Sequence, residues 1–561
     1  MMRQKIQIIA LIFGSFYSTY GTVRNVPANF ATIQSALNAC LIGDTVLVDT
    51  GIYYENIIWP NMEDIKLLSV GDSSNTIIDG NQTGRVLTFN DSIIIGNNTR
   101  INGFQIRNGS TCNGPGIWVA NSSPIFEKVS INNNHTFSYY DRGGGVYLKN
   151  SNSIFLSSSI YQNFIDSATS GRGGGIYIEE GAPYFEGINI SENHCASTSW
   201  GNGGGVYLEN SSAIFKKSSI SHNHIDTAKW GHGGGIAINM GTILLEDVDI
   251  SFNNIRSNAW NYGNGIYAIK SNIDLTNVII SSNSCDSTGK WYKGGGGYFE
   301  DCDCSMFNCL LHSNVIASNG IYGNGTALYV IYSANISPSF EIVNTTISNN
   351  LKGQSMNQAT AIICEDCVTN SINIKNSICY NSTNYAEFYD PASVNVAYSD
   401  IRGGFAGPGN IDFLPNFIST TDYHFNAASP CMNSANIAWS PAFDLDNGAR
   451  PLPLGTNPDM GCYESPLLYS GVQSESLNSI IVIYPNPATE SQNIEISSSK
   501  MEPLTIELLD MVGKKLSSVY QCYTVVGNQI LTFNLKTLPS GTYQYKIQVG
   551  EDLKSVRIYK Q

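Results

Sequence analysis

The stretch GGGIYIEEGAPYFEGINISEN, residues 173–193, is one unit of a repeat that recurs about every 30 residues. Each unit opens with a glycine block, continues through short runs in which apolar and polar residues alternate, and ends in an asparagine. The glycine blocks occupy residues 143–145, 173–175, 203–205, 233–235, 263–265 (as Gly-Asn-Gly) and 295–297. Self-similarity at a fixed period predicts a solenoid in which each repeat forms one coil.

Two columns of apolar residues run in phase with the glycine blocks. One contains phenylalanine, as in Phe155 and Phe185, and the other contains Ile or Leu three positions before the terminal asparagine, as in Ile160 and Ile190. Like residues stacked on successive coils form a continuous core that no single coil can form alone. The repeat therefore predicts an all-β solenoid.

The terminal asparagines form a third column, which we name the asparagine ladder. Its members are Asn134, Asn163, Asn193, Asn223, Asn253, Asn283, Asn314, Asn350 and Asn381. Asparagine tolerates the left-handed backbone conformation at a corner, and stacked amides hydrogen-bond from one coil to the next. We therefore predict that the ladder is structural and is not a binding site.

The composition of the 561 residues excludes some classes of protein. Hydrophobic residues make up 42% and charged residues 13%, which is not the composition of a disordered chain. A net charge of −15 argues against nucleic acid as the main partner. Arg3 and Lys5 precede a short apolar run, so residues 1–21 are interpreted as a secretory signal peptide. No later stretch is long enough to be a transmembrane segment, and we expect an exported monomer.

The first segments after the signal resemble a known fold. TIQSAL (32–37), GDTVLV (43–48) and GIYYENI (51–57) are similar to the start of right-handed parallel β-helix proteins of the pectin-lyase-like superfamily. The glycine blocks with their asparagines resemble the repeats of polymorphic outer-membrane proteins. The resemblance implies a right-handed parallel β-helix with an N-terminal helical cap. We assign residues 22–85 to the cap and first strands and residues 86–400 to the coils.

Residues 401–465 depart from the period. SPCMNSA (429–435), FDLDNGARP (443–451) and NPDMGCYE (457–464) resemble the closing segment of bacterial surface β-helices. The Asp-Leu-Asp-Asn-Gly piece lacks the spacing of a Ca²⁺ loop, so no metal or cofactor is predicted. Cys431 and Cys462 lie in two parts of this segment, and a disulfide between them is a hypothesis, because connectivity cannot be deduced from sequence.

The C-terminal end has a different character. A polar linker, 466–479, precedes residues 480–561, whose alternating strands predict a small β-sandwich. YPNPA (484–488), LLDMVGKKL (508–516) and LPSGTYQYKI (538–547) resemble the type A sorting domain of the type IX secretion system. The resemblance implies that the type IX secretion machinery is a partner and that the protein crosses the outer membrane to the cell surface or the extracellular space.

The segments between each asparagine and the next glycine block supply the candidate functional residues. In a solenoid such loops stack on one face, which is the usual binding surface. The candidate glycan-contact residues are Tyr140, Trp200, Trp230, Trp260, Tyr292, Arg142 and Arg172. Aromatic rings can stack on sugars or on one another as structural support. The arginines suit the carboxylate of an acidic sugar or are solvated surface residues.

Three functions are compatible with these residues. The first is binding of an extended polymer, a polysaccharide, along the loop face without catalysis. The second is a polysaccharide lyase or glycoside hydrolase acting on the same face. The third is an adhesin or structural surface protein. The Gln-Asp-Thr-Leu motif of pectin methylesterases, the Asn-Thr-Asp motif of polygalacturonases and the Arg-x-Pro-x-x-Arg motif of pectate lyases are absent from the sequence. Catalytic residues are therefore not assigned, and binding is the leading hypothesis.

Overall fold

The computed structural model describes residues 21–561, except for 91–93, 227, 286–290, 317–321, 334–338, 353–360, 370, 382–384, 467–478, 499–500, 511–513 and 551. The predicted signal peptide (1–21) and linker (466–479) lie almost entirely outside the described residues. The chain divides into two units, which are described separately: residues 1–244 with 253–259, and residues 245–252 with 260–561.

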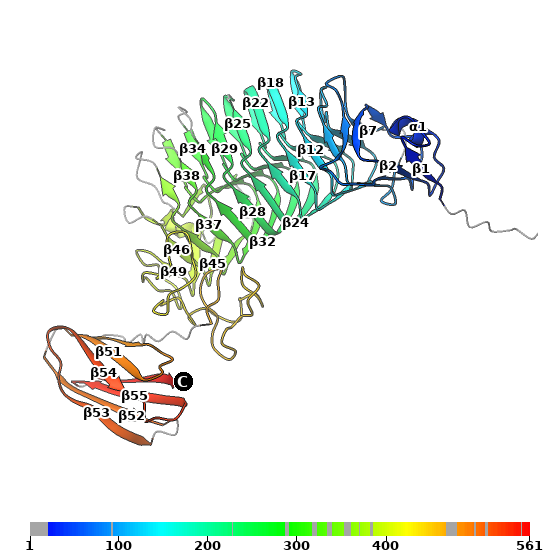
Figure 1. Ribbon diagram of the computed structural model, residues 1–561. Helices are drawn as coiled ribbons and strands as arrows, with labels where there is room; N and C mark the ends of the chain where they lie inside the picture. The colour runs from blue at the N-terminus through cyan, green and yellow to red at the C-terminus, as the bar shows by residue number, and fades with distance from the viewer. Residues whose placement is uncertain are drawn as a thin grey trace, which may run out of the picture. The chain divides into compact units, whose positions relative to one another are not determined.

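The chain is all-β, and its repeats form a parallel β-solenoid (Figure 1). Within each repeat, the strand after the glycine block pairs in parallel with its equivalent in the next repeat; Tyr177, for example, lies opposite Tyr207. In the first unit these strands are β4 (Ile57–Ile58), β7 (Leu87–Phe89), β10 (Ile117–Ala120), β15 (Val146–Lys149), β19 (Ile176–Glu179), β23 (Val206–Glu209) and β27 (Ile236–Asn239). In the second unit they are β31 (Ile266–Ile269), β35 (Gly297–Glu300), β40 (Leu328–Ile331), β44 (Ile362–Glu365) and β47 (Phe388–Tyr389).

A second parallel sheet carries the phenylalanine and isoleucine columns. Its strands in the first unit are β1 (Val23–Val26), β2 (Thr45–Val48), β3 (Gly51–Tyr54), β5 (Lys66–Ser69), β6 (Thr76–Asp79), β8 (Arg100–Asn102), β9 (Gln105–Arg107), β11 (Ile125–Glu127), β12 (Ser130–Asn132), β16 (Ile154–Leu156), β17 (Ser159–Tyr161), β20 (Tyr184–Glu186), β21 (Asn189–Ser191) and β24 (Ser212–Ser221). In the second unit they are β32 (Asn272–Ser281), β36 (Asp303–Phe307), β37 (Leu310–His312), β41 (Phe340–Val343), β42 (Thr346–Ser348), β45 (Ile372–Lys375), β46 (Ile378–Tyr380), β48 (Val394–Ala397) and β49 (Asp400–Ile401).

The core of the first unit is built from the predicted columns. Phe126, Phe155, Phe185 and Phe215 are fully buried, and their rings stack in order with centroids 4.7, 5.2 and 4.4 Å apart. The isoleucine column, which includes Ile160 and Ile190, is fully buried beside them. Stacked rings add about 0.5–1.5 kcal/mol per pair to the free energy of burial, so each coil stabilises its neighbours.

The asparagine ladder is a continuous hydrogen-bonded column within each unit. Asn163 Nδ2 donates to Asn193 Oδ1 at 3.0 Å and also to the carbonyl of Ile131, so each amide ties its coil to both neighbours. The ladder residues are not themselves left-handed, contrary to our expectation. The residue before each of them from Asn134 to Asn350 is, as at Gln162 (φ 52°) and Glu192 (φ 55°). The buried side-chain amide of the ladder asparagine thus stabilises a corner whose left-handed residue is the preceding one.

The N-terminal helical cap is not supported. Among the described residues of 22–85 the helix content is one six-residue helix, α1 (Ile33–Asn38), whose apolar side buries Ile33, Ala36 and Leu37. The Glu55 carboxylate accepts hydrogen bonds from the first backbone amides of this helix. The apolar spacing thus identified a helix, but this helix covers only six of the residues that were assigned to the cap and first strands.

The hypothesis of a disulfide between Cys431 and Cys462 is wrong for this structure, in which both are free thiols. They lie in two different hydrophobic clusters: Cys431 packs with Met460, and Cys462 packs with Tyr423. Cys431 Sγ instead donates to Asp400 Oδ2 at 3.2 Å.

The C-terminal residues form two small antiparallel sheets around a shared apolar core. One sheet contains β50 (Ser479–Tyr484), β51 (Ser491–Ser498) and β54 (Gly527–Asn534). The other contains β52 (Pro503–Leu509), β53 (Lys515–Tyr523), β55 (Gly541–Val549) and β56 (Asp552–Lys560).

Candidate functional site

In the first unit the loops between the ladder and the glycine blocks form an array of their own, which we name the loop array. Its strands are β13 (His135–Thr136), β14 (Tyr140–Arg142), β18 (Phe164–Arg172), β22 (His194–Asn202), β25 (His224–Asp226), β26 (Trp230–His232) and β29 (Asn254–Arg256). Figure 1 shows these loops side by side along one edge of the unit. Each loop leaves the coil along one segment and returns to it along a second segment. We call these two segments the outgoing limb and the returning limb.

The two limbs of each loop enclose a small apolar core of their own. Ile165, Cys195, Ile225, Ala228 and Ile255 are buried in it. Because side chains alternate along a strand, the residues between these positions face outward. The loop array is therefore an ordered surface with fixed side-chain columns.

The returning limbs carry the predicted aromatic residues in register. Tyr140 lies opposite Ser170, Ser170 opposite Trp200, and Trp200 opposite Trp230. We name these four positions the aromatic column. The rings of Trp200 and Trp230 stack with centroids 4.3 Å apart. Tyr140 is 64% exposed and Trp200 is 43% exposed, so both reach solvent.

A similar column exists in the second unit, but Tyr292 is not part of it. Trp260 in β30 (Trp260–Tyr262) lies opposite Trp291 in β34 (Trp291–Lys293), and their rings stack at 5.0 Å. Tyr292 is only 1% exposed and packs with Cys285 and Ile316. The assignment of Tyr292 to the loop face was therefore wrong.

The error came from a run of four glycines at residues 294–297. The first glycine of each block has a positive φ, 62° at Gly263 and 69° at Gly294, which marks these two as equivalent. The distance from Gly263 to the start of the next block is therefore one residue shorter than an alignment on residues 295–297 suggested. In a strand, a slip of one residue moves a side chain to the opposite face.

The orientation of the indole rings also limits how a ligand meets them. Trp200 and Trp230 are on neighbouring coils and use one face each for their mutual stack. A polymer lying along the column would therefore meet the edges of these two rings. A sugar ring that stacks on a face needs a face that no other indole covers.

Arg142 and Arg172 lie two residues beyond Tyr140 and Ser170 and are engaged within the protein. Arg172 Nη1 lies 2.8 Å from Glu209 Oε2, and its guanidinium lies over the ring of Tyr207. Arg142 is 3.4 Å from Glu179 in the equivalent arrangement. Burial raises the pKa of Tyr207 to about 12. Both arginines are therefore already paired with a carboxylate.

The outgoing limbs carry imidazole–carboxylate pairs. His135 Nδ1 is 3.0 Å from Asp166, and His194 Nδ1 is 3.1 Å from Asp226. The hydrogen bond from His194 holds the pKa of Asp226 below its usual range. No group of three or more His, Cys, Asp or Glu residues in the described part of the chain is arranged to hold a metal ion.

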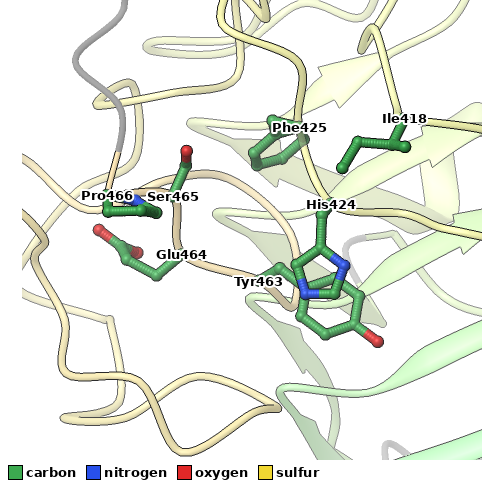
Figure 2. Close-up of a pocket in the computed structure, with 7 residues that line it drawn as sticks. All are labelled: Ile418, His424, Phe425, Tyr463, Glu464, Ser465 and Pro466. Carbon is green, nitrogen blue, oxygen red and sulfur yellow. The ribbon is translucent and has the colours of Figure 1, made fainter.

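Sequence patterns did not identify a cavity in the closing segment. It has a volume of about 320 Å³ and a largely apolar lining (Figure 2), which consists of Ile418, His424, Phe425, Tyr463, Glu464, Ser465 and Pro466. The repeat does not extend into this segment, so no periodic signal marks the cavity.

His424 is the best-defined polar group of this cavity. Its Nδ1 is 2.6 Å from Asp422 and its Nε2 is 2.8 Å from Asp446, while its ring stacks on Tyr463 at 3.9 Å. Burial lowers the pKa of His424, but the hydrogen bonds with Asp422 and Asp446 outweigh it and the pKa is raised. Both ring nitrogens are committed to internal carboxylates, so this imidazole serves to hold the segment together.

Comparisons with known proteins identify one part of the chain. Residues 482–561 match the family described as the secretion system C-terminal sorting domain. No curated protein matches the sequence. No helix among the described residues has the length and apolarity needed to cross a membrane.

Two solved structures show a weak similarity. One is the Azotobacter vinelandii mannuronan C-5 epimerase AlgE6 A-module, with 12% identity and a TM-score of 0.27 over 60% of this chain and 94% of that one. The other is the enzymatically active domain of bacteriophage CBA120 tailspike protein 4, with 10% identity and a TM-score of 0.18 over 94% of this chain and 64% of that one. Similarity this low supports no inference about activity.

The sorting domain and the repeat identify the two parts of the protein independently. The C-terminal match confirms the predicted sorting domain, and the stacked sheets confirm the predicted parallel β-solenoid. The protein is thus a β-solenoid protein with a secretion system C-terminal sorting domain, which marks it for the cell surface or the extracellular space.

Proposed function

We propose that the protein is a secreted, non-catalytic binding protein that holds an extended polysaccharide along its loop array. The observation that carries this proposal is the aromatic column, in which Tyr140 and Trp200, two coils apart at equivalent positions, expose large rings to solvent. Exposed aromatic residues bring apolar area and rigid shape to a binding surface at a low entropic cost.

The periodicity of the surface suits a polymer. Coils of a solenoid rise by about 4.8 Å, so the loop array offers equivalent contacts at a regular spacing. Extended surfaces built by stacking repeats are the usual binding faces of solenoid proteins. A polymer can contact several coils at once, and the contacts reinforce one another through effective concentration.

The charged groups of the array favour binding over catalysis. The two arginines are paired with Glu179 and Glu209, and the carboxylates of Asp166 and Asp226 are paired with histidines. Glycoside hydrolysis requires two carboxyl groups that flank the scissile bond. These four ion pairs stabilise the fold and leave the aromatic column as the contact surface.

A polysaccharide microarray tests the proposal. The protein is expected to bind one or more polymers. The double variant with Trp200→Ala and Trp230→Ala is expected to lose that binding, while its melting temperature stays well above the temperature of the assay. Tyr54→Ala is the matched control, because Tyr54 is 65% exposed on β3, outside the loop array. Equal binding by the double variant and the control variant would contradict the proposal.

A further inference from the structure

The aromatic column of the first unit is interrupted at one position. Tyr140 and Trp200 carry rings at equivalent positions two coils apart, and the residue between them in the register is Ser170. Where two consecutive positions both carry rings, as at Trp200 and Trp230, the rings stack directly at 4.3 Å. Ser170 therefore leaves a gap in the column with the width of one missing ring.

The two rings that border the gap have different neighbours. Trp230 covers one side of Trp200, and the coil on its other side carries Ser170. Tyr140 makes an edge-to-face contact with Tyr139 at 4.6 Å. Since two coils rise by roughly 10 Å and stacked ring centroids lie about 4.5–7 Å apart, one six-membered ring fits between Tyr140 and Trp200.

The charges near the gap indicate the type of ring. Arg142 and Arg172 lie two residues beyond Tyr140 and Ser170, but each forms an ion pair with a glutamate of the following coil. These four charges cancel, and the whole chain has a net charge of −15. A uronate would have to compete with Glu179 and Glu209 for the guanidinium groups, whereas a neutral sugar would leave both ion pairs intact.

We infer that Tyr140, Ser170 and Trp200 form a subsite that clamps one neutral pyranose residue of the bound polysaccharide between two aromatic rings. This inference rests on the proposed function and makes it specific, because it names the sugar class and the position of the contact. The clamped residue lies across the column, between the coil of Tyr140 and the coil of Trp200.

The test fills the gap without removing either ring. Ser170→Trp places an indole at the interrupted position and restores a continuous stack from Tyr140 to Trp230. Ser170→Ala is the matched control, because it leaves the gap open. Affinity is measured by titration calorimetry with neutral polymers (glucans, mannans and xylans) and with two polyuronates, alginate and polygalacturonate.

The inference predicts that the wild type binds a neutral polymer, that Ser170→Ala binds it within about twofold, and that Ser170→Trp binds it roughly tenfold or more weakly. Ser170→Trp should also keep or raise the melting temperature, since the new ring stacks on two neighbours. Unchanged affinity in Ser170→Trp, or binding of polyuronates alone, overturns the subsite while the proposed function stands. An absence of binding by the wild type to every polymer overturns the proposed function itself.

Discussion

Trp200 and Trp230, thirty residues apart in the sequence, stack their indole rings with centroids 4.3 Å apart and planes 24° from parallel. This contact joins two neighbouring loops on the outside of the solenoid. The same two residues are thus structural supports for the loops and part of the surface that we propose as the binding face.

The stack predicts a moderate loss of stability in Trp230→Ala. Removing the ring takes away its burial and one aromatic pair, which together amount to about 1–3 kcal/mol. Chemical denaturation followed by circular dichroism measures this change. The variant Tyr54→Ala removes an exposed ring on β3 and should lose less than about 0.5 kcal/mol. Equal losses in the two variants would show that the indole stack contributes nothing to stability.

The asparagine ladder predicts a larger loss in Asn193→Ala. Asn193 is fully buried, and its Nδ2 donates to Asn223 Oδ1 and to the carbonyl of Ile160. Its Oδ1 accepts from Asn163, so the substitution leaves several buried groups without partners. We expect a loss of about 2–4 kcal/mol.

The free energy of unfolding, obtained from denaturant titration, checks the ladder prediction. Asn272→Ala is the control, because Asn272 is exposed at the start of β32. The control should change stability by less than about 0.5 kcal/mol. A loss in Asn193→Ala no larger than that of the control contradicts the structural role of the ladder.

His424 predicts a pH dependence with a definite sign. Its pKa is raised by the hydrogen bonds with Asp422 and Asp446, which outweigh the effect of burial. A group whose folded-state pKa is raised stabilises the fold below its unfolded pKa, and this contribution is lost as pH rises through the folded pKa. The unfolded value for histidine is about 6.5.

The melting temperature of wild type minus that of His424→Gln should therefore be larger at pH 5.5 than at pH 8.5. Differential scanning calorimetry at both pH values measures it. Asp446→Asn removes one of the two carboxylates and should reduce the difference between the two pH values. A wild-type advantage that grows with pH contradicts the imidazolium–carboxylate arrangement.

Asp400 predicts a trend of the same sign over a lower pH range. Burial raises the pKa of this carboxyl to about 7, above the value of about 3.9 for an unfolded chain. The folded state therefore holds a proton more tightly, and its stability falls as pH rises from about 4 to 7. Asp400→Asn mimics the protonated carboxyl, so its stability relative to wild type should rise over this range and level off above it. Denaturation curves of wild type and Asp400→Asn, measured at pH 5 and at pH 8, test this prediction. A difference in stability between the two proteins that is the same at both pH values would contradict it.

The repeat made much of the architecture predictable. A period of 30 residues placed Phe155 over Phe185 and Asn163 over Asn193, because a column of like residues can pack only if the coils are in register. The exact length of each repeat was harder to predict from the sequence. The four glycines before Tyr298 obscured the spacing of 31 residues, so the sequence pattern placed Tyr292 where the structure has Trp291.

The candidate site was only partly predictable from the sequence. The aromatic positions followed from the repeat, but the pairing of Arg172 with Glu209 joins a corner of one coil to a strand of the next, 37 residues away. The equivalent Arg142 and Glu179 have the same separation, so a search for charged pairs at the period plus seven residues finds both. His424 and its two carboxylates lie outside the repeat, where no periodicity relates them.

The aromatic column, as proposed, is the surface that binds a polysaccharide. The most direct measurement is the affinity of the wild type and of Trp200→Ala for the polymer that the wild type binds best on a polysaccharide microarray, by calorimetry at one pH and salt concentration. The wild type should bind measurably, Trp200→Ala should lose roughly tenfold or more in affinity, and Tyr54→Ala should bind as the wild type does. Binding of equal strength by wild type and Trp200→Ala would contradict it.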